Sequence, residues 1–213
     1  LLAELAGRYF DPGVVSVVLG DASVGADFAR LPFDHLLFTG STRVGHDIMR
    51  AAADNLTPVT LELGGKSPAI LGPDYPLQKA AERIMVGKLL NAGQTCIAPD
   101  YVLVPAGREQ AFVEAARAVV AKCWPEMADT PDYTAIVYDR HYQRLQGYLD
   151  DARERGATVV PLSDAPPDAA RRRLPPVALL KVDDGMRVMQ DEIFGPLLPV
   201  LPYADLDAAI AWV

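Results

Sequence analysis

The sequence of 213 residues is poor in cysteine, in histidine and in clustered positive charge. Its two cysteines are too few for a disulfide framework or a four-cysteine zinc site, which is typical of a reducing compartment. The formal net charge is −8, and the one basic run is Arg171, Arg172 and Arg173. The sequence therefore predicts no positively charged face that would bind a nucleic acid or an anionic membrane. No apolar run approaches the ~18 residues of a membrane span, and no stretch has the pattern of a secretory signal. These absences predict a cytoplasmic protein with no metal, no nucleic-acid partner and no membrane partner.

Both ends of the sequence have the pattern of interrupted helices. Residues 1–6 form an apolar helical pattern without a capping residue before it, and residues 205–213 begin a helix that has not ended at Val213. We therefore expect a fragment that lacks both ends of a longer protein, and we expect this fragment to be inactive or barely active in isolation.

Between the ends, strand patterns alternate with helix patterns, which predicts an α/β protein with parallel, twisted sheets. A first part, residues 1–64, has expected strands at 14–19, 35–38 and 58–63, an expected helix at about 24–30, and a second expected helix that follows Gly45 and ends at about residue 54. A second part, residues 65–213, has expected strands at 101–104, 158–161, 177–181 and 197–201, and expected helices at about 77–90, 108–122 and 141–155. The proline-rich stretch 163–176 predicts an exposed loop.

Cys96 lies in a turn behind Gly93 and Gln94 and ahead of an expected strand. A thiolate is the effective nucleophile, and backbone N–H groups of a turn can stabilise both the thiolate and an oxyanion formed by its attack. Cys123 instead falls at helical spacing from Phe112, so we expect it to be a small buried apolar residue. No histidine is near Cys96 in the sequence, so a Cys/His dyad of the protease kind has no support.

Two further segments are ambiguous when each is considered alone. Gly40-Ser41-Thr42-Arg43-Val44-Gly45 lies where an expected strand turns into a helix, a place that favours an anion because free N–H groups and the helix dipole point there. A structural turn is the simpler interpretation, since Thr42 replaces the middle glycine of the usual fingerprint. Asp191-Glu192-Ile193-Phe194-Gly195-Pro196 is most simply a loop that enters a strand.

Glu62 lies on an expected strand, on the face opposite Val59, Leu61 and Leu63, because side chains alternate along a strand. A carboxylate at the carboxyl end of a parallel strand is where α/β proteins place ligand contacts. The alternative is a solvated acid at a strand end.

Taken together, these segments resemble the aldehyde dehydrogenase superfamily. Residues 38–45 are similar to its phosphate turn, 61–68 to its glutamate signature, 91–96 to its cysteine signature and 192–196 to its acid-aromatic motif. The order of the four segments, and the 34 residues between Glu62 and Cys96, fit the family. Residues 93–101 resemble the class 3 branch, and residues 33–38 and 49–58 resemble bacterial coniferyl aldehyde dehydrogenases.

The resemblance implies a three-layer αβα fold with parallel sheets. Residues 1–64 would be the C-terminal part of a dinucleotide-binding domain, and residues 65–213 most of a catalytic domain, truncated. It implies NAD- or NADP-dependent oxidation of a small aldehyde to a carboxylic acid through a cysteine thiohemiacetal and thioester, in a homodimer when the protein is full length. The substrate would be an aromatic aldehyde such as coniferyl aldehyde, giving ferulate. Alternatives are a medium- or long-chain aliphatic aldehyde, a non-catalytic dinucleotide-binding relative, and a cysteine hydrolase or acyltransferase.

The resemblance also assigns roles to residues. Cys96 would be the nucleophile and Glu62 the general base that activates water. The turn residues Gly40, Ser41, Thr42 and Gly45 would border the pyrophosphate of the dinucleotide, and the peptide of Leu63 would meet the carboxamide of the nicotinamide. Glu192 would bind the nicotinamide ribose, and Phe194 would line that end of the site. The family's oxyanion asparagine and its adenosine-ribose lysine belong to a segment before Leu1.

Overall fold

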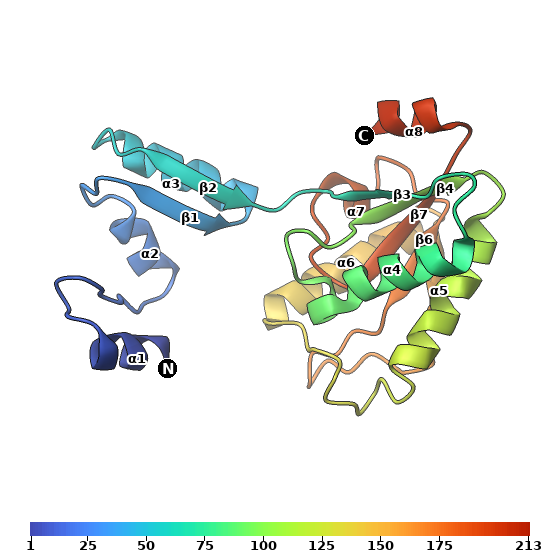
Figure 1. Ribbon diagram of the computed structural model, residues 1–213, viewed down its shortest axis with the longest axis horizontal. Coiled ribbons are helices and arrows are strands. Elements are labelled where there is room, and N and C mark those ends of the chain that lie inside the picture. The colour runs from blue at the N-terminus through green and yellow to red at the C-terminus, as the bar shows by residue number, and fades with distance from the viewer. The chain divides into compact units, whose positions relative to one another are not determined.

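The computed structural model describes all 213 residues as two compact units, Leu1–Leu63 and Gly64–Val213 (Figure 1). Helices and strands alternate in both units, and the strands pair mainly in parallel, so the predicted α/β class with parallel sheets is confirmed. The functional roles expected for residues 1–64 and 65–213 stay predictions.

The first unit is built on one parallel strand pair, in which Thr39 lies beside Glu62 and Gly40 beside Leu63. A small core lies under this pair, formed by Ala29, Leu36, Ile48 and Ala51. The elements are α1 (Leu2–Tyr9), α2 (Ala22–Phe28), β1 (Leu36–Gly40), α3 (Thr42–Ala53) and β2 (Val59–Leu63).

The expected strand at residues 14–19 was wrong. These residues form no ladder with β1 or β2, and Val14 and Leu19 are 78% and 76% exposed. A β-branched run reports a preference for extended backbone, but a strand also needs a neighbour that accepts its N–H and C=O groups. Here the backbone bonds are local, with the amides of Val14 and Val15 donating to the carbonyl of Asp11.

The second unit contains a five-stranded sheet in the order β3-β4-β7-β6-β5. Strands β3, β4, β7 and β6 are parallel, while the edge strand β5 is antiparallel to β6. The short strand β3 had not been expected, because its three residues are too few for a periodic pattern. The strands are β3 (Pro68–Ile70), β4 (Tyr101–Pro105), β5 (Thr158–Pro161), β6 (Val177–Leu180) and β7 (Leu197–Tyr203).

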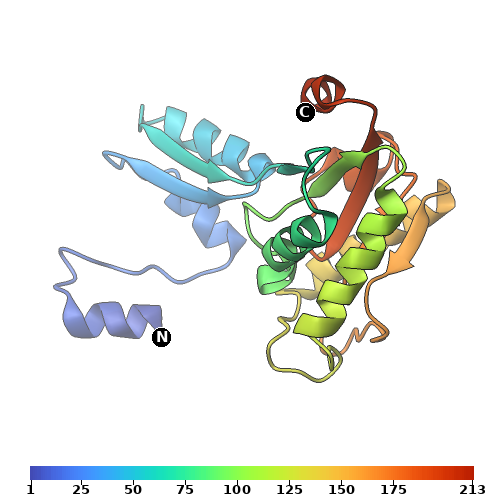
Figure 2. The ribbon, with the colours of Figure 1, turned by 45° about the vertical axis from the view of Figure 1, so that its right-hand side comes forward.

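The helices of the second unit cover both faces of its sheet. Figures 1 and 2 show α4 and α5 on one face and α6 and α7 on the other. No helix is both long enough and apolar enough to cross a bilayer. The helices are α4 (Leu77–Leu89), the 3-10 turn η1 (Leu90–Gly93), α5 (Glu109–Cys123), α6 (Asp139–Glu154), α7 (Arg187–Gln190) and α8 (Leu206–Trp212).

Parallel pairing decides which loops meet in the second unit. The amino ends of neighbouring parallel strands lie at the same edge of a sheet, so the segments that enter β3, β4 and β7 converge there. These segments are residues 64–67, 94–100 and 191–196. They contain most of the glutamate signature that follows Glu62, the cysteine turn and the acid-aromatic motif.

The prediction that Cys123 is buried was wrong, because the thiol is exposed. Cys123 is the last residue of α5, and its spacing from the buried Phe112 and Val119 would place it inside only if the helix packed on the sheet to its end. The chain leaves the helix at Trp124, whose ring packs edge-on against Tyr133.

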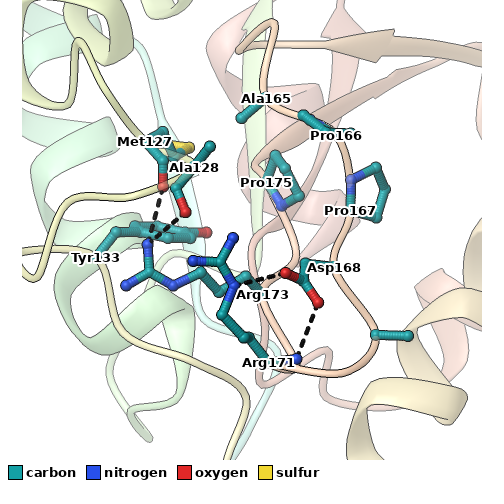
Figure 3. Close-up of a pocket in the computed structure, with 11 residues that line it drawn as sticks. Met127, Ala128, Tyr133, Ala165, Pro166, Pro167, Asp168, Arg171, Arg173 and Pro175 are labelled. Atoms are coloured by element: carbon teal, nitrogen blue, oxygen red, sulfur yellow. Dashed lines mark hydrogen bonds and ion pairs between the residues drawn. The ribbon is translucent and has the colours of Figure 1, made fainter.

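The loop 163–176 is exposed in its first part only. Its second part is anchored by the Arg173 guanidinium, which donates to the carbonyls of Met127, Ala128 and Thr130, and Leu174 is buried. A hollow of about 270 Å³ lies under the loop, as Figure 3 shows. None of the predicted site residues lines it, and the polar side chains in it bind one another or backbone carbonyls, so we assign it no role in the site.

Met85 and Val86 are neighbours on α4 that test this packing. Met85 is 0% exposed and Val86 is 53% exposed. We expect Met85→Ala to lower the free energy of unfolding by about 2–5 kcal/mol, because it leaves a cavity, and Val86→Ala to lower it by less than about 1 kcal/mol. Urea unfolding of the two variants measures the difference, and equal losses would contradict the orientation of α4.

Candidate active site

Cys96 is exposed in a turn between η1 and β4. The turn closes through a hydrogen bond of 3.2 Å from the Ala98 amide to the Thr95 carbonyl, and the next side chain, Ile97, is 82% exposed. The helix before it, α4, ends beside this turn, since Gly87 lies against the ring of Pro99. The thiol therefore lies at the surface, behind a helix and a turn that fix its backbone.

The backbone just before Cys96 is left-handed at three consecutive residues. The φ angles are 52° at Asn91, 54° at Ala92 and 77° at Gly93. This conformation costs a non-glycine residue roughly 1–2 kcal/mol, more for alanine than for asparagine. At Gly93 a side chain is also excluded, because a Cβ atom would collide with the carbonyl oxygen of Gly195. The cysteine turn thus packs backbone to backbone against the acid-aromatic motif.

Gln94 holds this strained turn in place. Its buried amide nitrogen donates to the carbonyls of Asn91 and Ala135, both at 3.0 Å, and its amide oxygen accepts from the Val137 amide at 2.9 Å. The Asn91 side chain returns a bond of 3.2 Å to the Gln94 carbonyl. One side chain therefore ties the turn to the connection between α5 and α6, which offsets the strain of the left-handed residues.

The acid-aromatic motif places the Glu192 carboxylate beside the backbone of Gly64 and Gly65. A Cβ atom at Gly64 would collide with that carboxylate, so only glycine allows the approach. Burial raises the pKa of Glu192, and the negative charge of Asp100 adds to the rise, while the Gly65 amide opposes it as a hydrogen-bond donor. Glu192 is partly exposed, so its oxygens remain open to a ligand.

The backbone of the same motif is held by Arg144 of α6. The guanidinium donates to the carbonyls of Glu192 at 3.1 Å and Ile193 at 2.7 Å, and it also reaches the hydroxyl of Tyr148 at 3.0 Å. The following residue, Phe194, is partly buried with a left-handed φ of 48°. No helix or strand fixes this segment, so side-chain bonds supply its rigidity.

Asp100 joins the three segments at the edge of the sheet. Its carboxylate is buried, accepts the Ile193 amide at 2.9 Å and pairs with the ammonium group of Lys66, and its own amide donates to the Ser67 carbonyl at 2.8 Å. Lys66 also donates to the carbonyls of Val188 and Asp191, both at 3.0 Å. A charged, fully bonded group at this point makes the three loops one rigid body.

A second lysine lies near this pair. Lys88 of α4 is 1% exposed, and its ammonium group has no hydrogen-bond partner. Burial lowers the pKa of Lys88 to about 8, although the charge of Asp100 opposes the decrease. An ammonium group removed from water without a bond is costly, so the nearby carboxylate is what makes this position tolerable.

The predicted residues of the first unit lie around the ends of β1 and β2. Gly40 ends β1, and Ser41 caps α3 by accepting the Val44 amide at 3.4 Å. Thr42 is the first residue of α3 and is exposed, while Gly45 is buried and faces Leu63. Residues 40–45 therefore form one continuous turn, from the end of β1 into the first turn of α3.

Glu62 is exposed on β2, and the partly buried Val59, Leu61 and Leu63 lie on the other face, as the alternation predicts. The structure brings Glu62 and the phosphate turn together in the first unit, and Cys96, Glu192 and Phe194 together in the second. That Glu62 meets Cys96 stays a prediction.

Sequence reasoning missed the charged and polar groups that support the site, namely Lys66, Lys88, Gln94, Asp100 and Arg144. For one of them a signal existed. Lys88 falls three and four residues after Met85 and Ile84, within the apolar stripe of α4, and a lysine in such a stripe indicates a buried charge. For the others, the sequence carries no sign of the partners, which lie far along the chain.

Comparison with known proteins agrees with this geometry. The sequence profile described as the aldehyde dehydrogenase family matches residues 1–213. A probable coniferyl aldehyde dehydrogenase of Pseudomonas aeruginosa is 60% identical over 213 residues, which is 100% of this chain and 44% of the relative. A coniferyl aldehyde dehydrogenase of a Pseudomonas species is 50% identical over 216 residues, covering 100% of this chain and 45% of the relative. A rat dimeric, NADP-preferring aldehyde dehydrogenase is 40% identical over 215 residues, or 100% of this chain and 46% of that one.

Solved structures agree as well. A substrate-bound Staphylococcus aureus AldH superposes with a TM-score of 0.92 at 38% identity, covering 100% of this chain and 45% of that one. A C291A mutant of Pseudomonas syringae aldehyde dehydrogenase C, complexed with NAD⁺ and octanal, superposes with a TM-score of 0.80 at 29% identity, covering 91% of this chain and 41% of that one.

The chain belongs to the aldehyde dehydrogenase family, because the family profile matches its full length. It spans less than half the length of the curated relatives it matches, 44% in the case of the relative from P. aeruginosa.

The left-handed alanine before Cys96 gives a test of backbone strain. We expect Ala92→Gly to destabilise the chain less than Ala116→Gly, by a difference of about 1 kcal/mol or more, because glycine relieves the left-handed conformation at 92 and weakens a helix at 116. Both alanines are 0% exposed, so each variant loses a buried methyl group, and Ala116 lies within α5. Equal or larger destabilisation by Ala92→Gly in urea unfolding would show that residue 92 is not strained.

Lys88 gives a test by pH. Since its pKa is about 8 in the folded state and 10.5 ordinarily, the unfolded chain binds more protons between these values. The unfolding free energy of the wild type should therefore rise relative to Lys88→Met, by about 3 kcal/mol from pH 7 to pH 10.5.

Lys122→Met is the matched control, because Lys122 is exposed at the end of α5. Its difference from the wild type should not change over the same pH range. A difference between the wild type and Lys88→Met that is constant with pH would contradict a buried, perturbed Lys88.

Proposed function

We propose that the protein oxidises an aldehyde to a carboxylic acid with NAD⁺ or NADP⁺, with Cys96 as the nucleophile. The observation that carries this proposal is the exposed thiol on a rigid, strained turn that packs directly against the Glu192 motif. Family membership and identities of 50% and 60% to two relatives named for aldehyde oxidation support the same reaction.

In the first step, the thiolate of Cys96 attacks the aldehyde carbon and forms a thiohemiacetal. The oxyanion needs N–H donors that are already in position, and the fixed backbone of the turn offers the Cys96 amide. The left-handed residues Asn91 and Ala92, held by Gln94, orient that amide without a cost at the moment of reaction. A rigid turn therefore favours both attack and stabilisation.

The residues present fit a dinucleotide. The N-terminus of α3, capped by Ser41 and preceded by Gly40, leaves backbone N–H groups free for a pyrophosphate, with Thr42 and Gly45 in the same turn. The partly exposed Glu192 carboxylate can accept ribose hydroxyls. When bound, the nicotinamide would supply the hydride acceptor: the C–H bond of the thiohemiacetal carbon would break, and Cys96 would be left as a thioester.

Leu63 and Phe194 would complete the cofactor site. The peptide of Leu63 follows Glu62 at the end of β2, where its polar groups can meet a carboxamide. Phe194, left-handed and partly buried, would line the nicotinamide end.

Glu62 would then act as the general base that activates water against the thioester. An exposed carboxylate is accessible to water and can take its proton. Its position on the polar face of β2, at the carboxyl end of the strand, supports a role outside the core.

An apolar side chain beside the thiol supports an apolar aldehyde. Ile97, the residue that follows Cys96, is 82% exposed. Two relatives are named for coniferyl aldehyde, so we propose an aromatic aldehyde such as coniferyl aldehyde, oxidised to ferulate. The octanal complex of the P. syringae protein makes an aliphatic aldehyde the second candidate.

The same comparisons and the free thiols support proposals for the cofactor, the assembly and the location. NAD⁺ is bound in the P. syringae structure, while the rat relative is named as NADP-preferring and dimeric, so either nucleotide and a homodimer are proposed. Two free cysteines, Cys96 and Cys123, suit the reducing conditions of the cytoplasm.

The reaction is tested by two cysteine variants of the complete protein. We expect Cys96→Ala to abolish aldehyde-dependent NADH or NADPH formation, because no other side chain of the proposed site can form the thioester. We expect Cys123→Ala to retain this activity. Both thiols are exposed, so accessibility alone does not distinguish them.

Formation of NADH or NADPH is quantified by chromatography with coniferyl aldehyde and octanal in parallel. Activity that survives in Cys96→Ala would reject the proposed nucleophile. Product formation without any nicotinamide would instead favour a hydrolase or acyltransferase, and nucleotide binding without turnover would favour a non-catalytic relative.

A further inference from the structure

We propose that Asp100 is a positioning residue of the dehydrogenase site, whose buried charge fixes the Glu192 segment against the Cys96 turn and neutralises Lys88. This inference rests on the proposed function and adds Asp100, Lys66 and Lys88, which the proposed mechanism does not use. Asp100 lies four residues after Cys96, at the entry to β4.

The carboxylate has two different bonds, one to each of its oxygens. Oδ1 accepts the Ile193 amide at 2.9 Å, and Oδ2 pairs with Lys66. The first bond fixes the residue directly after Glu192. The second fixes a lysine that binds the carbonyls of Val188 and Asp191. Asp100 therefore holds the Glu192 segment from both sides, directly and through Lys66.

The segment has few other restraints. It lies between the end of α7 at Gln190 and the start of β7 at Leu197, so no ladder or helix bond orients it. Other restraints are the Arg144 guanidinium on the carbonyls of Glu192 and Ile193, the Gly65 amide on the Glu192 carboxylate, and the Val177 amide on the Pro196 carbonyl at 3.0 Å. Loss of Asp100 would release the amide of Ile193 and the ammonium of Lys66 together, and the Glu192 carboxylate would be free to shift.

Charge balance adds a second requirement. Lys66 and Lys88 bring two positive charges next to the one buried carboxylate of Asp100, and the Lys88 ammonium makes no hydrogen bond. Removing one partner of a buried charge pair leaves the other uncompensated. Two lysines and one carboxylate give these three groups a net charge of +1 in the wild type. Asp100→Asn would keep an oxygen for the Ile193 amide but raise that net charge to +2, whereas Asp100→Asn with Lys88→Met would return it to +1.

These two roles predict a specific kinetic pattern in the complete protein. We expect Asp100→Asn to raise the KM and the dissociation constant of NAD⁺ about tenfold, with the KM of the aldehyde changed by less than about twofold, because Glu192 shifts while the thiol turn keeps its own bonds to Gln94. We expect the added Lys88→Met change to recover most of the NAD⁺ affinity.

The matched control is Asp150→Asn. Asp150 is an exposed aspartate of α6 that pairs with Arg153, and its replacement should leave both KM values unchanged. Thermal unfolding followed by circular dichroism sets a temperature at which every variant is folded, and all kinetics are measured there. Binding of NAD⁺ is measured separately, by quenching of tryptophan fluorescence without aldehyde.

Three results would overturn the inference. One is an Asp100→Asn variant that binds NAD⁺ within about twofold of the wild type. Another is an equal rise in both KM values, which a general loss of structure would give. A third is no recovery of the NAD⁺ affinity when Lys88→Met is added to Asp100→Asn, which would reject the charge balance.

Failure of the inference and failure of the proposed function are distinguishable. If the wild type binds NAD⁺ but oxidises no aldehyde, the proposed function fails while the binding comparison still decides the role of Asp100. If the wild type binds no NAD⁺, both fail.

Discussion

Parallel pairing of β3, β4 and β7 is the constraint on which the rest of the site depends. Because these strands enter the sheet at the same edge, loops that are about a hundred residues apart in the chain become neighbours. The cysteine turn and the acid-aromatic motif then need only short-range bonds to hold each other. Gly93 packs on Gly195, and Asp100 binds Ile193. The sheet supplies proximity, and the side chains supply orientation.

The thiol site also shows how local strain and local bonds are matched. Two non-glycine residues before Cys96 adopt left-handed backbone, which an isolated peptide would avoid. A single buried side-chain amide, that of Gln94, binds the Asn91 carbonyl of this turn and two backbone groups of the α5–α6 connection. The backbone N–H groups around the thiol are therefore held in one arrangement before any substrate arrives.

Most of the strands and helices could be predicted from the sequence, because their apolar residues repeat with a period of about two or 3.6. Residues 14–19 could not, since a β-branched run does not reveal whether a partner strand exists. Cys123 was misjudged because helical spacing does not show where α5 leaves the sheet. The motifs around Glu62 and Cys96 were recognisable in the sequence. The supporting bonds were not, because a contact such as that of Asp100 with Ile193 joins residues 93 positions apart.

Burial of the Asp100–Lys66 pair has a consequence for the solution conditions that the site tolerates. Mobile ions screen charges only where water and salt can reach them, over a distance of ~8 Å at physiological ionic strength. Each of the other ion pairs in the chain has at least one partner well exposed to solvent, whereas Asp100 and Lys66 are largely enclosed. Added salt would therefore weaken the exposed ion pairs first and leave the geometry between Cys96 and Glu192 intact.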